Sequence, residues 1–279
     1  MGKLKYLLIV LFILVFLKGF NQDDTDKSCF DSIAEKIINN RYEDAYSQIN
    51  GFLLKKKTTF QKIELYYYPP LDNFLNNSIY KNKIFNNILG MYYKEYPCED
   101  SLIANNCIKM YINDQKYRRF KTWYYKNLPE KIDSIKKEWD KADIRNKIIA
   151  SDYLDKYKVD ELSKLGKFCV YSLFMVVQHS PYEIQKKYFP IFNYLVKKEM
   201  LSASTLALME DRILRKEGKL QKYGTQVYCN NITNICIPQP HISIDSMNFY
   251  RMKVGLSNIC IYWRENFNID CDSLIQDNK

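Results

Sequence analysis

The sequence predicts a mainly α-helical protein with one small β-hairpin. Apolar residues recur every three or four positions through most of the chain, which is the spacing of one helical face. Between Tyr223 and Ile237 the spacing changes to two on either side of an Asn-rich turn, which is typical of paired strands. Pro129 and Pro181 stand where first helical turns are expected, a position that tolerates the missing amide hydrogen.

The N-terminus has the pattern of a secretory signal peptide, which we place at residues 1–19. Two lysines precede an unbroken apolar run from Tyr6 to Leu17, shorter than the ~20 residues that span a bilayer. We therefore expect export to the periplasm, the cell surface or the medium, and no membrane span beyond this leader. No Ala-x-Ala pattern follows the run, so an uncleaved N-terminal anchor is the alternative.

A helical N-terminal arm is expected over residues 26–107. Asp26 or Ser28 can cap a first helix that ends at the Asn39-Asn40 turn. The expected elements that follow are a helix over Tyr42–Leu54, an extended segment over Tyr66–Pro70 and a helix over Ile84–Tyr93.

The main helical domain is expected over residues 108–265, followed by a C-terminal tail at 266–279. Gly218 fits a left-handed helix end, and Ser243 or Asp245 can cap a final helix that runs to about Trp263. The hairpin is placed at residues 223–237. The other expected helices are Tyr111–Tyr125, Pro129–Trp139, Ala142–Tyr157, Gly166–Val177, Pro181–Glu199 and Ser204–Glu217.

Eight cysteines follow the leader, an even number that makes disulfides plausible in an exported chain. Cys169 lies in an apolar run and is interpreted as a buried thiol. The chain has no C-x-x-C and only two histidines, so neither a zinc site nor a cofactor is expected. The expected pairs are Cys229–Cys236 across the hairpin, Cys98–Cys107 and Cys260–Cys271.

The formal charge of +10 does not by itself indicate a nucleic-acid partner. Basic residues are spread along the chain and interleaved with acids, which is typical of a solvated surface. We expect an unidentified small polar ligand or an exported protein as the partner, and no nucleic acid.

His179 is the first candidate for chemistry. Together with Gln178 it ends the apolar run VYSLFMVV and precedes Ser180-Pro181, a junction at which core packing can hold an imidazole at a cavity wall. The alternative is a histidine that only bonds loop carbonyls. His241, in a connector, is interpreted as structural or solvated.

Asp211 and Arg212 lie side by side on the helix Ser204–Glu217, and they diverge by about 100° around its axis. A buried Asp211 would need an outside partner, such as a backbone amide or Arg251. Arg212 could hold a carboxylate, a phosphate or a carbonyl. The alternative is an exposed lattice of charged side chains.

Two glutamines, Gln221 and Gln226, bracket Tyr223-Gly224-Thr225. Gly224 would allow close approach of a backbone or a ligand, and the amides offer donors and acceptors together. A plain strand entrance is the alternative.

Asp114 with Arg118, and Asp143 with Asn146, place polar residues on one helical face. Salt-bridged surface turns explain most such pairs, so this signal is weak on its own.

In combination these residues resemble an exported bacterial family with a domain of unknown function, over about residues 110–265. The resemblance implies a domain and a set of residues but no reaction. This chain departs from it after Gln178-His179, where Ser180-Pro181 replaces the usual Ala-Asp. The matching motifs are D-Q-x-x-R at Asp114, D-x-x-N at Asp143, Q-H at Gln178, a later Gln185, D-R at Asp211, G-x-x-Q-x-Y-G-T-Q from Gly218 and R-x-x-x-G-L from Arg251.

Three functions remain open, and the sequence does not decide whether the protein is an enzyme. The first is a polar pocket in which His179 and Asp211 are catalytic, with the histidine as general base and water as nucleophile. The second is a noncatalytic binding module that uses the tyrosines of the arm. The third is a purely structural polar network. Ligand binding in the first function is assigned to Arg212, Gln221, Tyr223, Gln226, Arg251, Asp114, Arg118 and Gln178.

Overall fold

The protein is mainly α-helical, as predicted, with one two-stranded antiparallel sheet in the part of the chain that the structure describes. A computed structural model describes residues 24–57, 59–95, 100–119, 124–125, 127–230 and 235–271. The predicted leader and the end of the predicted tail lie outside these residues. The chain divides after Ser180 into two compact units, which we call the N-terminal unit (described from residue 24 to 180) and the C-terminal unit (181 to 271).

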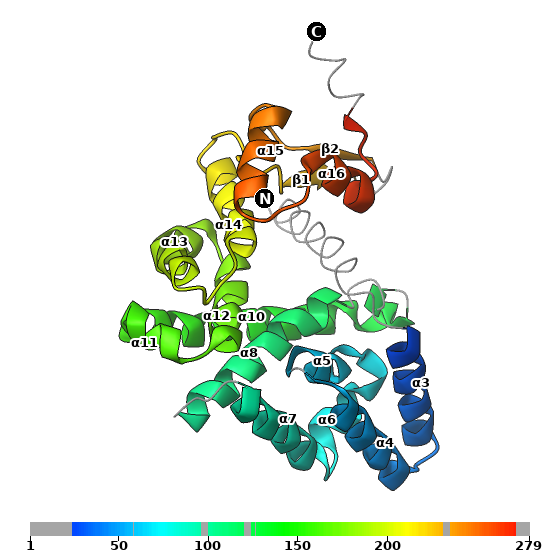
Figure 1. The fold of residues 1–279 in the computed structure, drawn as a ribbon. Coiled ribbons are helices and arrows are strands. Elements are labelled where there is room, and N and C mark those ends of the chain that lie inside the picture. The colour runs from blue at the N-terminus through cyan, green and yellow to red at the C-terminus, as the bar shows by residue number, and fades with distance from the viewer. Residues whose placement is uncertain are drawn as a thin grey trace. The chain divides into compact units, whose positions relative to one another are not determined.

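The N-terminal unit begins with short helices that pack on one another (Figure 1). Phe30 of α3 meets Phe52 of α4 edge to face, with ring centroids 5.0 Å apart. The predicted second helix is confirmed and ends one residue later than expected. These elements are α3 (Asp24–Ile38), α4 (Tyr42–Lys55), α5 (Thr59–Ile63), η1 (Glu64–Tyr67), η2 (Pro69–Leu71), α6 (Asp72–Asn77) and α7 (Lys81–Glu95).

The prediction of an extended segment over Tyr66–Pro70 is wrong except at Tyr68. Two 3-10 turns flank that residue, which alone has an extended backbone (φ −78°, ψ 106°) because a proline follows it. Tyr66, Tyr67 and Tyr68 are buried, as is Tyr92. These four tyrosines of the arm therefore belong to the core of the unit.

The remaining elements of this unit surround α8 (Ser101–Arg119), which packs against α10 and α12. We predicted two helices over residues 129–157, but a single one, α10 (Ile132–Lys156), follows the 3-10 turn η3 (Pro129–Lys131). Nothing in the sequence between them breaks a helix. The unit ends with α11 (Val159–Lys164) and α12 (Lys167–Gln178). The predicted domain boundary near residue 108 falls within α8 and stays a prediction.

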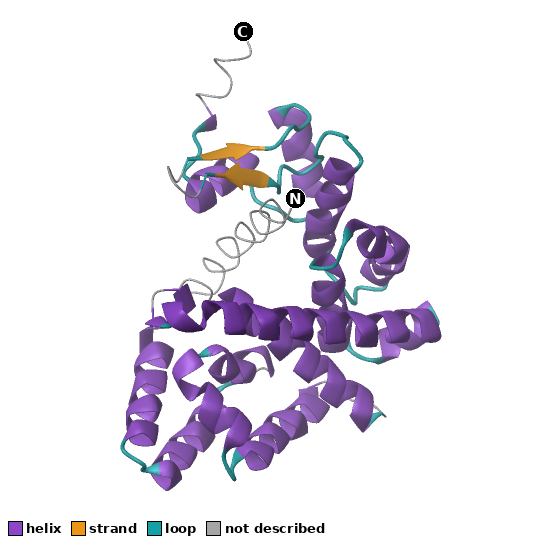
Figure 2. Cartoon of the chain, turned by 180° about the vertical axis from the view of Figure 1, so that it is seen from behind, coloured by secondary structure: helices purple, strands orange, loops and turns teal. Residues whose placement is uncertain are grey.

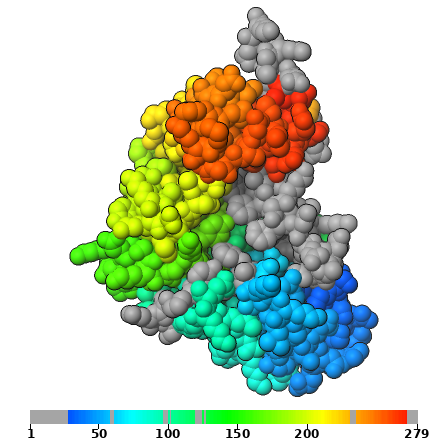
Figure 3. Space-filling model, viewed as in Figure 1, coloured from blue at the N-terminus to red at the C-terminus, as the bar shows by residue number. Residues whose placement is uncertain are grey.

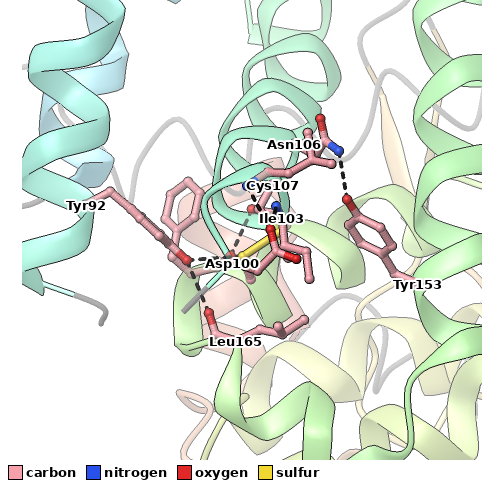
Figure 4. The surroundings of a disulfide bond; sticks show 11 residues. Tyr92, Asp100, Ile103, Asn106, Cys107, Tyr153 and Leu165 are labelled. Carbon is pink, nitrogen blue, oxygen red and sulfur yellow. Dashed lines mark hydrogen bonds between the residues drawn. A yellow bond between two sulfur atoms is a disulfide. The ribbon is translucent and has the colours of Figure 1, made fainter. Parts of the chain in front are cut away.

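A disulfide between Cys107 of α8 and Cys169 of α12 ties these two helices together, with Cα atoms 5.1 Å apart (Figure 4). The prediction of a Cys98–Cys107 pair is therefore wrong, and so is that of a free thiol at Cys169. The Tyr92 hydroxyl donates to the Leu165 carbonyl at 3.2 Å and lies 3.1 Å from Cys169 Sγ. The disulfide is thus enclosed by helices that are distant in sequence.

The C-terminal unit contains four helices and the hairpin among its described residues (Figure 2). Pro181 precedes α13 (Tyr182–Lys197), Ser202 caps α14 (Ala203–Lys216), and Gly218 follows with the left-handed backbone that we predicted (φ 72°). The strands β1 (Val227–Cys229) and β2 (Cys236–Pro238) are shorter than predicted, because residues 223–226 form a loop. The predicted Cys229–Cys236 disulfide joins the strands.

The predicted final helix is two helices, α15 (Ile244–Lys253) and α16 (Ile259–Phe267). Gly255, with φ 75°, ends the first, and Asn258 caps the second. The cap predicted at Ser243 and the disulfide predicted between Cys260 and Cys271 are confirmed. Figure 3 shows α15 and α16 side by side on the visible face of this unit. Their core is an apolar cluster centred on Met247, Ile259 and Trp263.

No helix within the described ranges combines the length and the apolar character needed to cross a membrane.

Candidate functional site

His179 is held by Asp114, a residue 65 positions earlier in the sequence. Its Nδ1 lies 2.9 Å from each carboxylate oxygen of Asp114. Asp114 projects from α8, whereas His179 stands at the C-terminal end of α12, where the helix leaves the apolar core. The side chains are 2% and 10% exposed, so the contact is largely shielded from water. The predicted packing of the imidazole at a helix junction is thus accompanied by a specific carboxylate partner.

Arg118 links this pair to a second carboxylate. Its two terminal nitrogens bond Asp143 of α10 at 3.0 and 2.8 Å, and Nη1 also lies 3.0 Å from Asp114. The guanidinium stands 5.3 Å from the ring centroid of Trp139. Such a two-pronged contact fixes the plane of the guanidinium. The motif residues that looked like surface turns therefore form a network between three helices.

The charges around Asp114 keep its carboxylate ionised. Burial by itself would raise its pKa, but Arg118, His179 and Gln115 outweigh that effect, and the pKa lies below its ordinary value. Gln115 contributes a hydrogen bond of 2.7 Å from its amide nitrogen. Because an ionised carboxylate only accepts hydrogen bonds, His179 Nδ1 must be the donor in this pair.

Two further predicted residues lie in the same unit. Gln178 is fully buried at the end of α12. Asn146, on α10, donates to the Met110 carbonyl of α8 at 3.0 Å and so helps to dock these helices.

Asp211 is fully buried in the C-terminal unit and binds the loop that follows α14. Its carboxylate accepts backbone N–H bonds from Lys222 (2.7 Å), Tyr223 (3.0 Å) and Thr225 (2.9 Å), and a hydroxyl bond from Thr225 (2.9 Å). The prediction that a buried Asp211 needs an outside partner such as a backbone amide is confirmed. Burial raises its pKa, and these donors oppose the rise.

Gln221 and Gln226 brace the same loop. The Gln221 amide nitrogen donates to the carbonyls of Gln226 (2.8 Å) and Gln239 (2.9 Å), while its amide oxygen accepts from the Gln226 N–H (2.5 Å). Gln221 also bridges to His241, whose Nδ1 lies 2.7 Å from the Ile242 carbonyl. The structural interpretation of His241 fits this position. Gln221 and Gln226 hold the backbone to which the hairpin is attached.

Gly224 allows close approach, as predicted, but the approaching atoms are core side chains. With φ 68°, it lies so close to Ile259 and Met247 that an added Cβ would stand 2.8 and 2.9 Å from them. The neighbouring Tyr223 donates its hydroxyl to Glu210 at 3.1 Å.

Arg251 is 1% exposed and contacts main-chain oxygens. Its Nη1 donates to the Tyr223 carbonyl at 2.6 Å and its Nε to the Ser257 carbonyl at 2.5 Å. The guanidinium carbon stands 4.7 Å from the ring centroid of Tyr262. Burial lowers the pKa of Arg251 to about 10, and the charges of Tyr262 and Asp211 offset this only in part. Arg212 is half-buried and lies within electrostatic range of Tyr262.

The predicted site residues thus fall into two groups, one in each unit. Asp114, Arg118, Gln178 and His179 belong to the N-terminal unit; Asp211, Arg212, Gln221, Tyr223, Gln226 and Arg251 belong to the C-terminal unit. The convergence of all of them on one pocket stays a prediction. The described residues contain no group of three or more His, Cys, Asp or Glu that could hold a metal ion.

Sequence reasoning missed Trp139 and Tyr262 as neighbours of the two arginines. Each lies on a helix other than that of its arginine, and no local pattern pairs an aromatic ring with an arginine on another helix.

A model of a family described as a "Family of unknown function (DUF6624)" matches residues 109–269, which is more than half of the chain. No curated protein and no solved structure matches.

Proposed function

We propose that this chain, which belongs to the DUF6624 family of unknown function, binds a small polar ligand beside His179 and uses the imidazole as a proton acceptor. The observation that carries the proposal is the placement of His179 Nδ1 at 2.9 Å from both oxygens of the buried Asp114 carboxylate. A carboxylate on one ring nitrogen orients the imidazole and makes the other nitrogen the basic one.

Proton transfer in this arrangement would use His179 Nε2. With Nδ1–H donated to Asp114, Nε2 carries the lone pair and can take a proton from water or from a hydroxyl of the ligand. The protonated imidazole is then stabilised by the Asp114 charge. Arg118 and Gln115 are positioning residues, because they hold Asp114 ionised and in place.

The reaction class that suits these residues is hydrolysis or group transfer with water as the nucleophile. No serine or cysteine in the sequence has a setting recognisable as that of a nucleophile. Asp211, the other predicted catalytic residue, is assigned a structural role, since its carboxylate accepts four hydrogen bonds from the loop over residues 222–225.

Nitrogen NMR of the imidazoles tests this proposal directly, because the chain has only two histidines. With His241→Gln used for assignment, His179 should be protonated on Nδ1 in its neutral form, and Asp114→Asn should shift this tautomer preference. A screen of small polar compounds should then find ligands that move the His179 resonances and leave those of His241 in place.

The matched variants are His179→Gln and His241→Gln. Loss of ligand binding in the first and retention in the second supports the proposal. A ligand that binds His179→Gln as tightly as the wild-type protein would sink it, as would a neutral His179 protonated on Nε2.

Export is part of the proposal. Three disulfides, Cys107–Cys169, Cys229–Cys236 and Cys260–Cys271, support it, because disulfides persist mainly in oxidising compartments. The mature protein purified from cells should begin near residue 20 and contain these bonds by mass spectrometry. A retained N-terminus would favour the anchored alternative, and fully reduced cysteines would contradict export.

The two other functions fare differently. A binding module built on the arm tyrosines is disfavoured, since Tyr66, Tyr67, Tyr68 and Tyr92 would have to leave the core. A structural network describes Asp211, Gln221 and Gln226 well, since the hydrogen bonds of these side chains hold the loop and the hairpin.

A further inference from the structure

Arg251 and Tyr262 of the C-terminal unit contact each other, and each has a polar atom that makes no hydrogen bond to the network around Asp211. Arg251 Nη2 and the Tyr262 hydroxyl are both fully buried, and neither has a hydrogen-bond partner among the described residues. The two groups belong to one contact, because the guanidinium carbon lies 4.7 Å from the Tyr262 ring centroid. Buried donors without partners are rare in native proteins, and they call for a specific explanation.

Asp211 does not supply the missing partner. The Tyr223 backbone contacts both charged groups: its N–H donates to Asp211 and its carbonyl accepts from Arg251 Nη1. The Asp211 oxygens are already engaged by Thr225 and Lys222. Arg251 therefore donates to main-chain oxygens and has no carboxylate within bonding distance in the described part of the chain.

Two arginines near the Tyr262 hydroxyl favour a negative charge there. Burial is the main cause of its raised pKa, while among the nearby charges Arg251 acts most strongly and in the direction that favours an anion. Arg212 acts in the same direction, and Asp211 opposes both. The two arginines would therefore attract a carboxylate next to the hydroxyl, against the cost of burying its charge.

We propose that Arg251 and Tyr262 bind a small carboxylate, at a place separate from the polar-ligand site proposed at His179. Arg251 Nη2 would donate to one carboxylate oxygen and the Tyr262 hydroxyl to the same or the other oxygen. The single negative charge of a carboxylate matches the single positive charge of the Arg251 guanidinium. The enclosure of both donor atoms excludes a large polyanion.

Tyr262→Phe separates this proposal from a packing role. The substitution keeps the ring and its contact with Arg251, and it removes only a hydroxyl that has no partner in the described residues. Without ligand the variant should be at least as stable as the wild-type protein, since an unsatisfied buried group is removed. With acetate as the probe, its Kd should rise about tenfold or more, the loss expected for a hydrogen bond to a charged group.

The experiment is a titration with sodium acetate at constant ionic strength, followed by thermal unfolding and by calorimetry on the full mature chain. Acetate should raise the Tm saturably in the wild-type protein. Tyr228→Phe, which alters an exposed tyrosine of β1, is the matched control and should respond like the wild type. Arg251→Lys should bind more weakly than the wild type because a lysine cannot reproduce the planar donor fork.

Three results would overturn the inference: no saturable response to acetate, an equal response in Tyr262→Phe and wild type, or saturable binding of phosphate or sulfate in place of acetate. None of these bears on His179, so the two proposals fail or stand separately. His179→Gln should leave the acetate response unchanged.

Discussion

At the scale of single residues, the molecule uses two buried aspartates in different ways. Asp114 contacts side chains that carry charge or can acquire it, His179 and Arg118. Asp211 contacts mainly backbone amides and holds a loop. A carboxylate that accepts hydrogen bonds from amides does not transfer protons to them, whereas one bonded to an imidazole changes the basicity of that imidazole. This contrast is why we assign Asp114 to the orientation of His179 for proton transfer and Asp211 to folding.

Asp114→Asn should reduce stability in a pH-dependent way. The folded-state pKa of Asp114 lies below its ordinary value of 3.8, so its charge stabilises the fold above that pH, and this contribution is lost as the pH falls below it. At pH 7 the variant should lose about 3 kcal/mol, because Arg118 stays buried and keeps only Asp143. The gap between wild type and variant should narrow as the pH falls below 3.8.

Urea unfolding at several pH values measures this gap. The control is Asp133→Asn, whose side chain is 94% exposed and should cost under about 0.5 kcal/mol. A gap that widens with acid would refute the role given to the Asp114 charge.

Gly224→Ala should be far more damaging than Gly218→Ala. Both glycines have positive φ values, 68° and 72°, so each substitution strains the backbone by about 1 kcal/mol. Only at Gly224 would the new methyl group clash, with Ile259, Met247 and Trp263 within 3.1 Å. We expect a total loss of about 3 kcal/mol or more at Gly224 by chemical denaturation. Equal losses at the two sites would mean that the loop can move away from Trp263.

At the scale of elements, the sequence predicted those helix ends that one local residue signals. Pro181, Gly218 and Ser243 stand where expected, because a proline, a left-handed glycine and a serine cap act within one turn. Gly255 was missed as a helix break, since the apolar spacing continues across it. The merging of two predicted segments into α10 was missed for the opposite reason, because no breaker separates them.

Contacts between residues far apart in the sequence could not be predicted from local sequence patterns. Cys107 and Cys169 are 62 residues apart, and His179 and Asp114 are 65 apart. Only the packing of α8 against α12 brings them together. The Asp211 contacts were within reach because their partners lie 11 to 14 residues away, on the loop after the same helix.

The three disulfides should differ in what they contribute. In the chain-entropy model, the closed loop of 62 residues at Cys107–Cys169 corresponds to about 4 kcal/mol, against about 3 kcal/mol for Cys260–Cys271 and about 2 kcal/mol for Cys229–Cys236. Paired Cys→Ala variants compared by urea unfolding should follow this order. A larger loss at Cys229–Cys236 than at Cys107–Cys169 would contradict it.

At the scale of the whole molecule, the family match begins at residue 109, yet the described core of the N-terminal unit begins much earlier. Tyr67 packs on Tyr111 of α8, with ring centroids 6.3 Å apart, and Tyr92 packs on Phe168 of α12 at 5.6 Å. The predicted arm is therefore integral to this unit. Residues 109–180 would expose a large apolar face without it.

A chain of residues 109–279 should accordingly fail to fold as the full protein does. Loss of the arm uncovers Tyr111 and Phe168 and removes the Tyr92 hydrogen bond to Leu165. We expect aggregation, or a broad unfolding transition with a Tm lower by more than about 10 °C. Near-ultraviolet circular dichroism and thermal scans of both chains measure this. A sharp transition at the original Tm would mean that the arm is dispensable.

The hydrogen bonds from backbone N–H groups to Asp211 have a consequence for how the sequence of this protein can diverge. Every amino acid except proline has a backbone N–H, so position 222 could exchange its lysine for many others and keep the hydrogen bond to Asp211. Proline at this position would remove that hydrogen bond. The Y-G-T-Q motif would then reflect which residues this loop can accept in its folded conformation. Residues that take part in a reaction should be sought where side chains contact other side chains, as at Asp114 and His179.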